Sequence, residues 1–190
     1  MPESMEQYVN TFESILSKAT ASIEVDYIQL PMHGREDPIY RERVYCYELY
    51  HQLRVAWPSD FPFSLGGEVD KNGHPLFREE HLLKTKPDLL VHQPGNMDGN
   101  LIVLEVKPVN ARSSEIVKDL STLTAFRRSA NYTSAIYLIY GNSERSFSRL
   151  KNIAESTEQP GSVDLRTIKL YWHSQHHEPA TRFEWSVASA

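Results

Sequence analysis

The segment LIVLEVK, residues 101–107, decides how the rest of the chain is interpreted. Its first four residues, Leu101 to Leu104, are all apolar, which is typical of a central β-strand buried on both faces. Charged side chains then appear at the end of the strand, at Glu105 and Lys107. Because side chains two positions apart on a strand share a face, we expect this carboxylate and this ammonium group to project together.

A second strand is predicted just before it, in PDLLVH, residues 87–92, and the connecting loop QPGNMDGN is rich in turn formers. In a symmetric hairpin over this loop Asp88 faces Glu105, with Cβ atoms about 4.5–5.5 Å apart. Two carboxylates this close repel each other unless a proton or a cation lies between them. We therefore expect a divalent metal ion here, beside Lys107, although a one-residue slip would place the acids on opposite faces. The same register pairs Leu90 with Val103 and His92 with Leu101.

The segments around the hairpin predict a sheet with helices on its faces. The expected helices are 4–19, 38–57, 113–130 and 143–156, and the other expected strands are 23–30, 63–69, 134–141, 165–173 and 181–187. We predict one domain, residues 1–190, of the α/β (α+β) class, with a mixed central sheet, an N-terminal helix and a C-terminal β-hairpin. The helix at 38–57 is apolar nearly all round, which predicts burial between layers.

Pro87-Asp88 followed by Glu105-Val106-Lys107 resembles the signature of the PD-(D/E)xK nuclease superfamily. The predicted order of elements is also similar to the restriction-endonuclease-like αβββαβ core of that family. The resemblance extends from about residue 38 to 140, within a predicted core of about 38–173. The helix at 113–130 lacks the QxxxY motif of the RecB-like branch, so no subfamily is indicated.

The resemblance implies a nuclease that hydrolyses phosphodiester bonds, in particular those of DNA, with Mg²⁺ as cofactor and Mn²⁺ as a substitute. It implies that Asp88 and Glu105 bind the metal together with the carbonyl group of Val106. Lys107 would orient the attacking water and offset the charge that grows on the phosphorane. The family also carries an acidic residue on the helix before the first strand, and Glu48 is the candidate for it.

Other residues carry weaker indications. Glu68 is a candidate for a further carboxylate at the site. Four cations in or near the helix at 113–130 are candidates for phosphate contacts, although a solvated helix face explains them equally well: Arg112, Lys118, Arg127 and Arg128.

Two interpretations compete with the nuclease. The first is a catalytically inactive protein with the nuclease fold that acts as a nucleic-acid-binding or scaffold module. The second is an unrelated α/β protein in which both motifs occur by chance.

The net charge of −5 is unusual for a nucleic-acid-binding protein, whose binding surface is normally basic. The negative charge is concentrated at the ends, however, because residues 1–27 carry five acids and one lysine, and residues 152–190 carry five acids and three basic residues. The middle of the chain is therefore slightly positive, which is compatible with nucleic acid, in particular DNA, as the expected partner. A second copy of the chain, in a homodimer, is the other candidate partner.

The composition is ordinary for a globular protein, with 40% hydrophobic and 24% charged residues. No apolar run approaches the roughly 20 residues of a transmembrane helix, and the N-terminal MPESMEQYVN lacks the features of a signal peptide. The single cysteine, Cys46, excludes an internal disulfide and a Cys-rich zinc site. We therefore expect a cytoplasmic protein without membrane association.

Overall fold

The computed structural model describes residues 4–67, 86–159 and 162–186. Its helices are α1 (Met5–Ala21), α2 (Val25–Ile28), α3 (Glu42–Ala56), α5 (Ser113–Ser129) and α6 (Glu144–Ser156), with short 3-10 turns η1 (Met97–Gly99) and η2 (Leu165–Thr167). Its strands are β1 (Ser64–Gly67), β2 (Leu89–His92), β3 (Asn100–Pro108), β4 (Ser134–Tyr140), β5 (Ile168–His173) and β6 (Thr181–Phe183). None of the described helices is long and apolar enough to span a bilayer.

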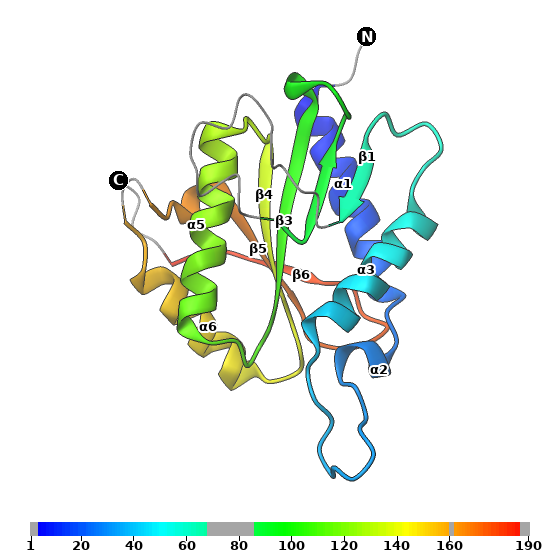
Figure 1. Ribbon diagram of the computed structural model, residues 1–190, viewed down its shortest axis with the longest axis vertical. Helices are drawn as coiled ribbons and strands as arrows, with labels where there is room; N and C mark the ends of the chain where they lie inside the picture. The colour runs from blue at the N-terminus through cyan, green and yellow to red at the C-terminus, as the bar shows by residue number, and fades with distance from the viewer. Residues whose placement is uncertain (1–3, 68–85, 160–161, 187–190) are drawn as a thin grey trace.

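The six described strands form one mixed sheet in which their spatial order is their order in the chain. Strands β1, β2 and β3 are antiparallel, β3, β4 and β5 are parallel, and β6 returns antiparallel to β5. Helices α5 and α6 make the two parallel crossovers and cover one face, whereas α1 and α3 cover the other (Figure 1). The predicted mixed sheet flanked by helices is confirmed, as are the N-terminal helix and the C-terminal hairpin.

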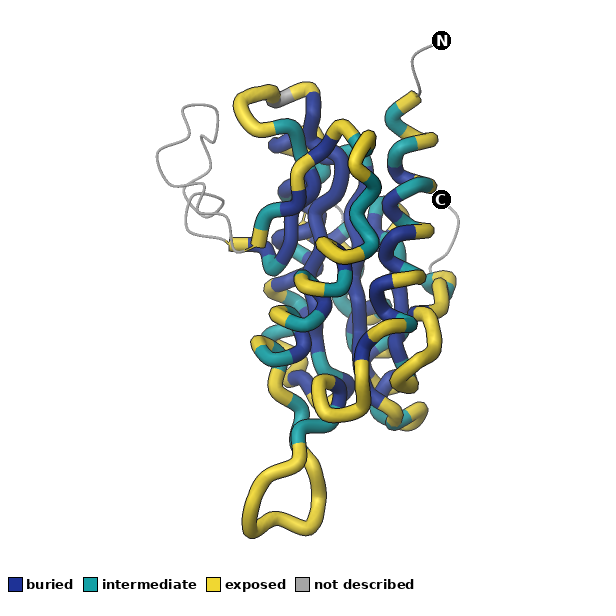
Figure 2. Tube along the Cα trace, turned by 90° about the vertical axis from the view of Figure 1, so that its right-hand side faces the viewer, coloured by how far each residue is buried: buried dark blue, intermediate teal, exposed yellow. Residues whose placement is uncertain are grey.

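Two hydrophobic clusters lie on opposite sides of this sheet, and β3 contributes to both. Ile102 and Leu104 pack in the cluster that contains α1 and α3, whereas Val103 packs in the cluster that contains α5 and α6. This explains why the strand is apolar at consecutive positions, and Figure 2 shows the buried strands between layers of partly exposed helices. Helix α3 is not buried all round as predicted, because Tyr47 and Val55 on it are 64% and 68% exposed.

The β2–β3 hairpin has the predicted register at the end that carries the acids. Leu89 pairs with Leu104, and Leu90 pairs with Val103. The register shifts between Val91 and His92, so that His92 faces Asn100 and not the predicted Leu101. Because this irregularity lies at the loop end of the hairpin, it does not change the alignment of Asp88 with the end of β3.

The strand predicted at residues 23–30 is wrong, because the chain forms the short helix α2 there. An amphipathic strand would have buried Ile23, Val25 and Tyr27 on one face. Instead Ile23 and Ile28 are buried, while Val25 and Tyr27 are 45% and 37% exposed. A helical turn buries these two isoleucines against the core, and this tertiary packing overrides a short alternating pattern.

A buried histidine on β5 predicts a measurable dependence of stability on pH. His173 is fully buried, its Nδ1 lies 2.8 Å from the hydroxyl of Tyr45, and burial lowers the pKa of His173 to about 4. Since the unfolded chain binds the proton more tightly, the stability that His173 contributes is present above about pH 6.5 and is lost as the pH falls toward 4. The loss should be about 3 kcal/mol, measured as the free energy of urea unfolding between pH 7 and pH 4.

The matched variant is His173→Gln, which retains a hydrogen-bonding group but does not titrate. The difference between the two proteins isolates His173, because all other titrating groups are common to both. If the unfolding free energies of the wild type and of His173→Gln changed with pH in parallel, His173 would not be the group responsible.

Candidate active site

Asp88 and Glu105 are brought together by the register of the hairpin. Asp88 directly precedes β2, and its Oδ2 accepts a hydrogen bond of 2.7 Å from the backbone N–H of Val106. This bond fixes the carboxylate against the end of β3, next to Glu105, a residue that is only 5% exposed. The predicted juxtaposition of the two carboxyl groups is therefore present.

The proximity of the two acids changes the protonation of Glu105. Burial raises the pKa of Glu105 well above its usual value, the negative charges of Asp88 and Asp119 raise it further, and Lys107 opposes them. A carboxyl group in these surroundings needs either a proton or a nearby cation.

Lys107 lies two residues further along β3 and is held by two carboxylates. Its Nζ is 2.8 Å from Glu42 Oε2 and 3.3 Å from Asp119 Oδ2. Burial alone would lower the pKa of Lys107, but the charges of Asp119 and Glu42 outweigh burial and raise it. The ammonium group therefore remains charged, and its position is fixed from both α3 and α5.

Helix α5 contributes Asp119 to the site, a residue for which no role was predicted. It is 5% exposed, and burial raises its pKa to about 7, with Lys107 opposing and Asp88 and Glu42 adding to the shift. A signal for it was present in the sequence, because position 119 lies in the stripe of α5 that also buries Ile116, Leu120 and Leu123. An acid in an apolar stripe requires a partner, and here the partner is Lys107.

On α3, the acid that reaches the site is Glu42 and not the predicted Glu48. Glu42 begins the stripe that continues through Tyr45 and Leu49, whereas the carboxylate of Glu48 accepts a hydrogen bond of 2.6 Å from Gln52. Burial raises the pKa of Glu42, while its hydrogen bond to Lys107 lowers it and Asp88 raises it. Glu48 follows Glu42 by six residues, which turn the helix by about 240°, so the two side chains project from different sides of α3.

We call Glu42, Asp88, Glu105, Lys107 and Asp119 the acidic cluster. With four carboxyl groups and one ammonium group it has a large excess of negative charge when fully ionised, and a divalent cation would compensate it. The described residues contain no group of three or more Asp, Glu, His or Cys side chains already arranged to hold a metal ion. The donor set nevertheless fits Mg²⁺, which proteins commonly bind through one or two carboxylates while water and substrate phosphate supply the other ligands.

Two other metal-site predictions stay predictions. The N–H of Val106 is bonded to Asp88, which places this residue at the site, but a role of its carbonyl group as a ligand is untested. Glu68 lies outside the described residues.

The four predicted phosphate-contacting cations fall into two pairs along α5. Arg112 and Lys118 are exposed near the start of the helix, close to the acidic cluster, and Arg112 forms an ion pair of 2.7 Å with Glu115. Arg127 and Arg128 lie near the other end, about 12 Å beyond Asp119 along the helix axis. The first pair is therefore the one placed beside the site.

A cavity of about 340 Å³ adjoins Asp88 and is lined by Cys46, Tyr47, Tyr50, Gly67 and Leu89. Tyr47 is 64% exposed at its rim. Burial raises the pKa of the Cys46 thiol, so this group stays protonated and is unsuited to act as a nucleophile. The cavity offers an aromatic surface next to the carboxylates.

We compared the chain with protein-family models, with curated protein sequences and with solved structures. No family model, curated protein or solved structure matches it. The function is therefore inferred from the chemistry of the site itself.

Proposed function

We propose that this protein is an Mg²⁺-dependent nuclease of the PD-(D/E)xK type that hydrolyses phosphodiester bonds in DNA. The observation that carries the proposal is the placement of Asp88 beside Glu105, with the charged Lys107 on the same strand. The order α3, β1, β2, β3, α5, β4 supports a restriction-endonuclease-like core, which is part of the same proposal.

In this proposal Asp88 and Glu105 would hold Mg²⁺ at the open end of the β2–β3 hairpin. The bound ion would polarise the scissile phosphate and lower the pKa of the attacking water. The hydrogen bond from Val106 N–H keeps Asp88 in place before substrate arrives, so little rearrangement is needed. The repulsion within the cluster would favour binding of the ion, because the ion would replace a proton that Glu105 otherwise takes up.

Lys107 orients the attacking water and stabilises negative charge in the transition state. Its two ion pairs keep the ammonium group within the site and protonated. Glu42, 37% exposed in its side chain, takes the place we predicted for Glu48. The tyrosine-lined cavity next to Asp88 offers a stacking surface for a base near the scissile phosphate.

The test is cleavage of single- and double-stranded DNA by purified protein with Mg²⁺ or Mn²⁺, and with EDTA. We expect cleavage that requires the metal and that falls by about 10²–10³-fold in Asp88→Asn. Asp98→Asn is the matched control, because Asp98 is an exposed acid in the loop of the same hairpin. Metal-dependent cleavage that persists in Asp88→Asn would exclude the proposed site.

A catalytically inactive nucleic-acid-binding module is the second candidate. The observation in its favour is that Lys107 is fully engaged by two carboxylates, as in a structural ion-pair network. DNA binding without any metal-dependent turnover would identify this function instead.

A further inference from the structure

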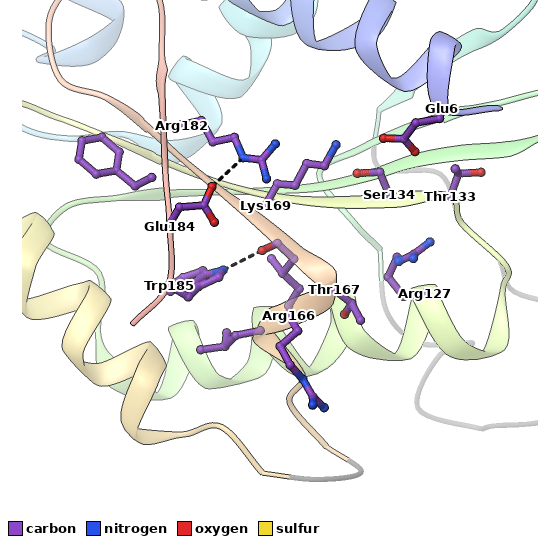
Figure 3. A pocket seen from close by; sticks show the side chains of 13 residues that line it. Glu6, Arg127, Thr133, Ser134, Arg166, Thr167, Lys169, Arg182, Glu184 and Trp185 are labelled. Atoms are coloured by element: carbon purple, nitrogen blue, oxygen red, sulfur yellow. Dashed lines mark hydrogen bonds and ion pairs between the residues drawn. The ribbon is translucent and has the colours of Figure 1, made fainter. Parts of the chain in front are cut away.

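A second cavity, of about 650 Å³, lies away from the acidic cluster, between the end of α5 and the strands β4, β5 and β6 (Figure 3). We call it the basic cavity; its lining includes Arg127, Ser134, Lys169, Arg182 and Trp185. Ser134 pairs with Ile102 and Lys107 pairs with Ile139, so the two sites are separated by about 16 Å along β3. None of the residues of the acidic cluster lines it.

Arg127 is the cation whose charge is least compensated in this cavity. Its Nη1 donates to the carbonyl of Tyr132, its Nε is buried without a hydrogen-bond partner, and no carboxylate within the described part of the chain forms an ion pair with it. Burial lowers the pKa of Arg127, and the charge of Glu6, which also lines the cavity, offsets this only in part. A half-buried guanidinium group whose charge is not compensated costs folding free energy unless an anion binds next to it.

Ser134 supplies a second polar group. The residue is 5% exposed, and its Oγ is buried without a hydrogen-bond partner among the described residues. It lies at the first position of β4, in the wall of the cavity that also contains Arg127 (Figure 3). Buried hydroxyl groups are normally paired, so an acceptor in the cavity would satisfy this one.

The other cations differ in their availability. Lys169 is held by Glu13 at 2.5 Å, with both side chains largely buried. Arg182 forms a longer ion pair, 3.4 Å, with the highly exposed Glu184, and such pairs contribute little. Arg182 can therefore turn toward an anion at the rim of the cavity. Lys169 is held in place by its ion pair with Glu13, so its charge is already compensated.

The geometry points to a binding site for a nucleoside monophosphate, with the phosphate on Arg127 and Ser134 and the base toward Trp185. Arginine presents a planar fork that suits phosphate oxygens. The indole of Trp185 is fixed by a hydrogen bond of 2.7 Å from Nε1 to the carbonyl of Ile168 and offers a flat apolar surface. The volume of about 650 Å³ exceeds that of phosphate alone and lies in the range of small-molecule sites. This inference does not depend on the proposed nuclease function, because the two sites share no residue.

The test is titration of the full-length protein with adenosine 5′-monophosphate, adenosine and inorganic phosphate in buffer with EDTA, followed by calorimetry and by tryptophan fluorescence. We expect saturable binding of the monophosphate, weaker binding of phosphate, and at least tenfold weaker binding of adenosine. Arg127→Gln should weaken binding of the monophosphate by roughly 10–100-fold and Ser134→Ala by about 3–10-fold. Trp185→Phe should remove the fluorescence change.

Arg128→Gln is the matched control, because it removes the same charge from the adjacent position of α5 outside the cavity lining. Asp88→Asn should bind the monophosphate normally, and Arg127→Gln should retain any metal-dependent cleavage, which separates this inference from the nuclease proposal. If Arg127→Gln does not fold, the effect of about 3–10-fold expected of Ser134→Ala decides the outcome. Equal affinity for adenosine, an equal effect of Arg128→Gln, or no saturable binding by the wild-type protein would overturn the inference.

Discussion

Replacing Glu105 by glutamine is expected to weaken metal-dependent cleavage strongly and at the same time to stabilise the protein at alkaline pH. The amide cannot serve as an anionic metal ligand, so we expect cleavage to fall by about 10²–10³-fold. Glu105 is buried beside Asp88, which raises its pKa, and the folded state at pH 8 must either bury its charge or take up a proton. A neutral amide of nearly the same shape avoids this cost, and we expect a gain of about 1 kcal/mol.

The sign of the stability effect depends on pH. Because the folded-state pKa is raised, the stability that Glu105 provides as a protonated acid is complete below its unfolded-state pKa and is lost as the pH rises. The advantage of Glu105→Gln should therefore be present at pH 8 and vanish near pH 4, as measured by urea unfolding. Glu144→Gln, at an exposed position on α6, is the control. A glutamine variant that is less stable than the wild type at pH 8 would contradict the electrostatic description of the site.

Replacing Lys107 by methionine is expected to have the opposite effect on stability. Methionine fills a similar volume but leaves Asp119 and Glu42 without the ammonium group that they share. Removing one partner of a buried ion pair costs about 3–5 kcal/mol, and we expect a loss of this size at pH 8. Cleavage should be lost as well, because nothing then offsets the charge of the transition state.

The loss of stability in Lys107→Met should shrink as the pH falls. Asp119 has a pKa of about 7 even with Lys107 present, so in its absence the carboxyl group is protonated near neutral pH and its burial costs less. Urea unfolding at pH 8 and pH 5.5 measures the difference, and Lys118→Met, at the exposed neighbour of Asp119, is the matched control. A loss of unfolding free energy below about 1 kcal/mol at pH 8 would mean that Lys107 does not interact strongly with Asp119 and Glu42.

The centre of the sheet was predictable because its signals are local and redundant. The apolar run that precedes Glu105 predicts a strand buried on both faces, and the turn-rich loop before this run predicts the hairpin. The period of two then determines which side chains share a face, so the sequence alone predicts that Asp88 lies opposite Glu105. The shift of register at His92 was not predictable, because the shift arises at the loop end of the hairpin, where no buried face requires a particular alignment.

The supporting residues of the site were not found, although their sequence positions carried a signal. Asp119 lies in the buried stripe of α5, and Glu42 lies in line with the buried stripe of α3, whereas Glu48 lies outside that stripe. Glu48 does not fit the site because a helix rotates by about 100° per residue, and this rotation decides which helical side chains reach the sheet. The contact of Lys107 with both helices depends on how these helices pack across the end of β3. The local sequence pattern of a single helix or strand does not specify such long-range packing.

The most direct test of the central claim is a crystal structure of the protein soaked in Mn²⁺, with anomalous diffraction recorded near the manganese edge. We predict an anomalous peak at bonding distance, about 2.1–2.2 Å, from carboxylate oxygens of both Asp88 and Glu105. A saturating soak that produces no peak between these two side chains would contradict the account, even if manganese were found elsewhere on the molecule.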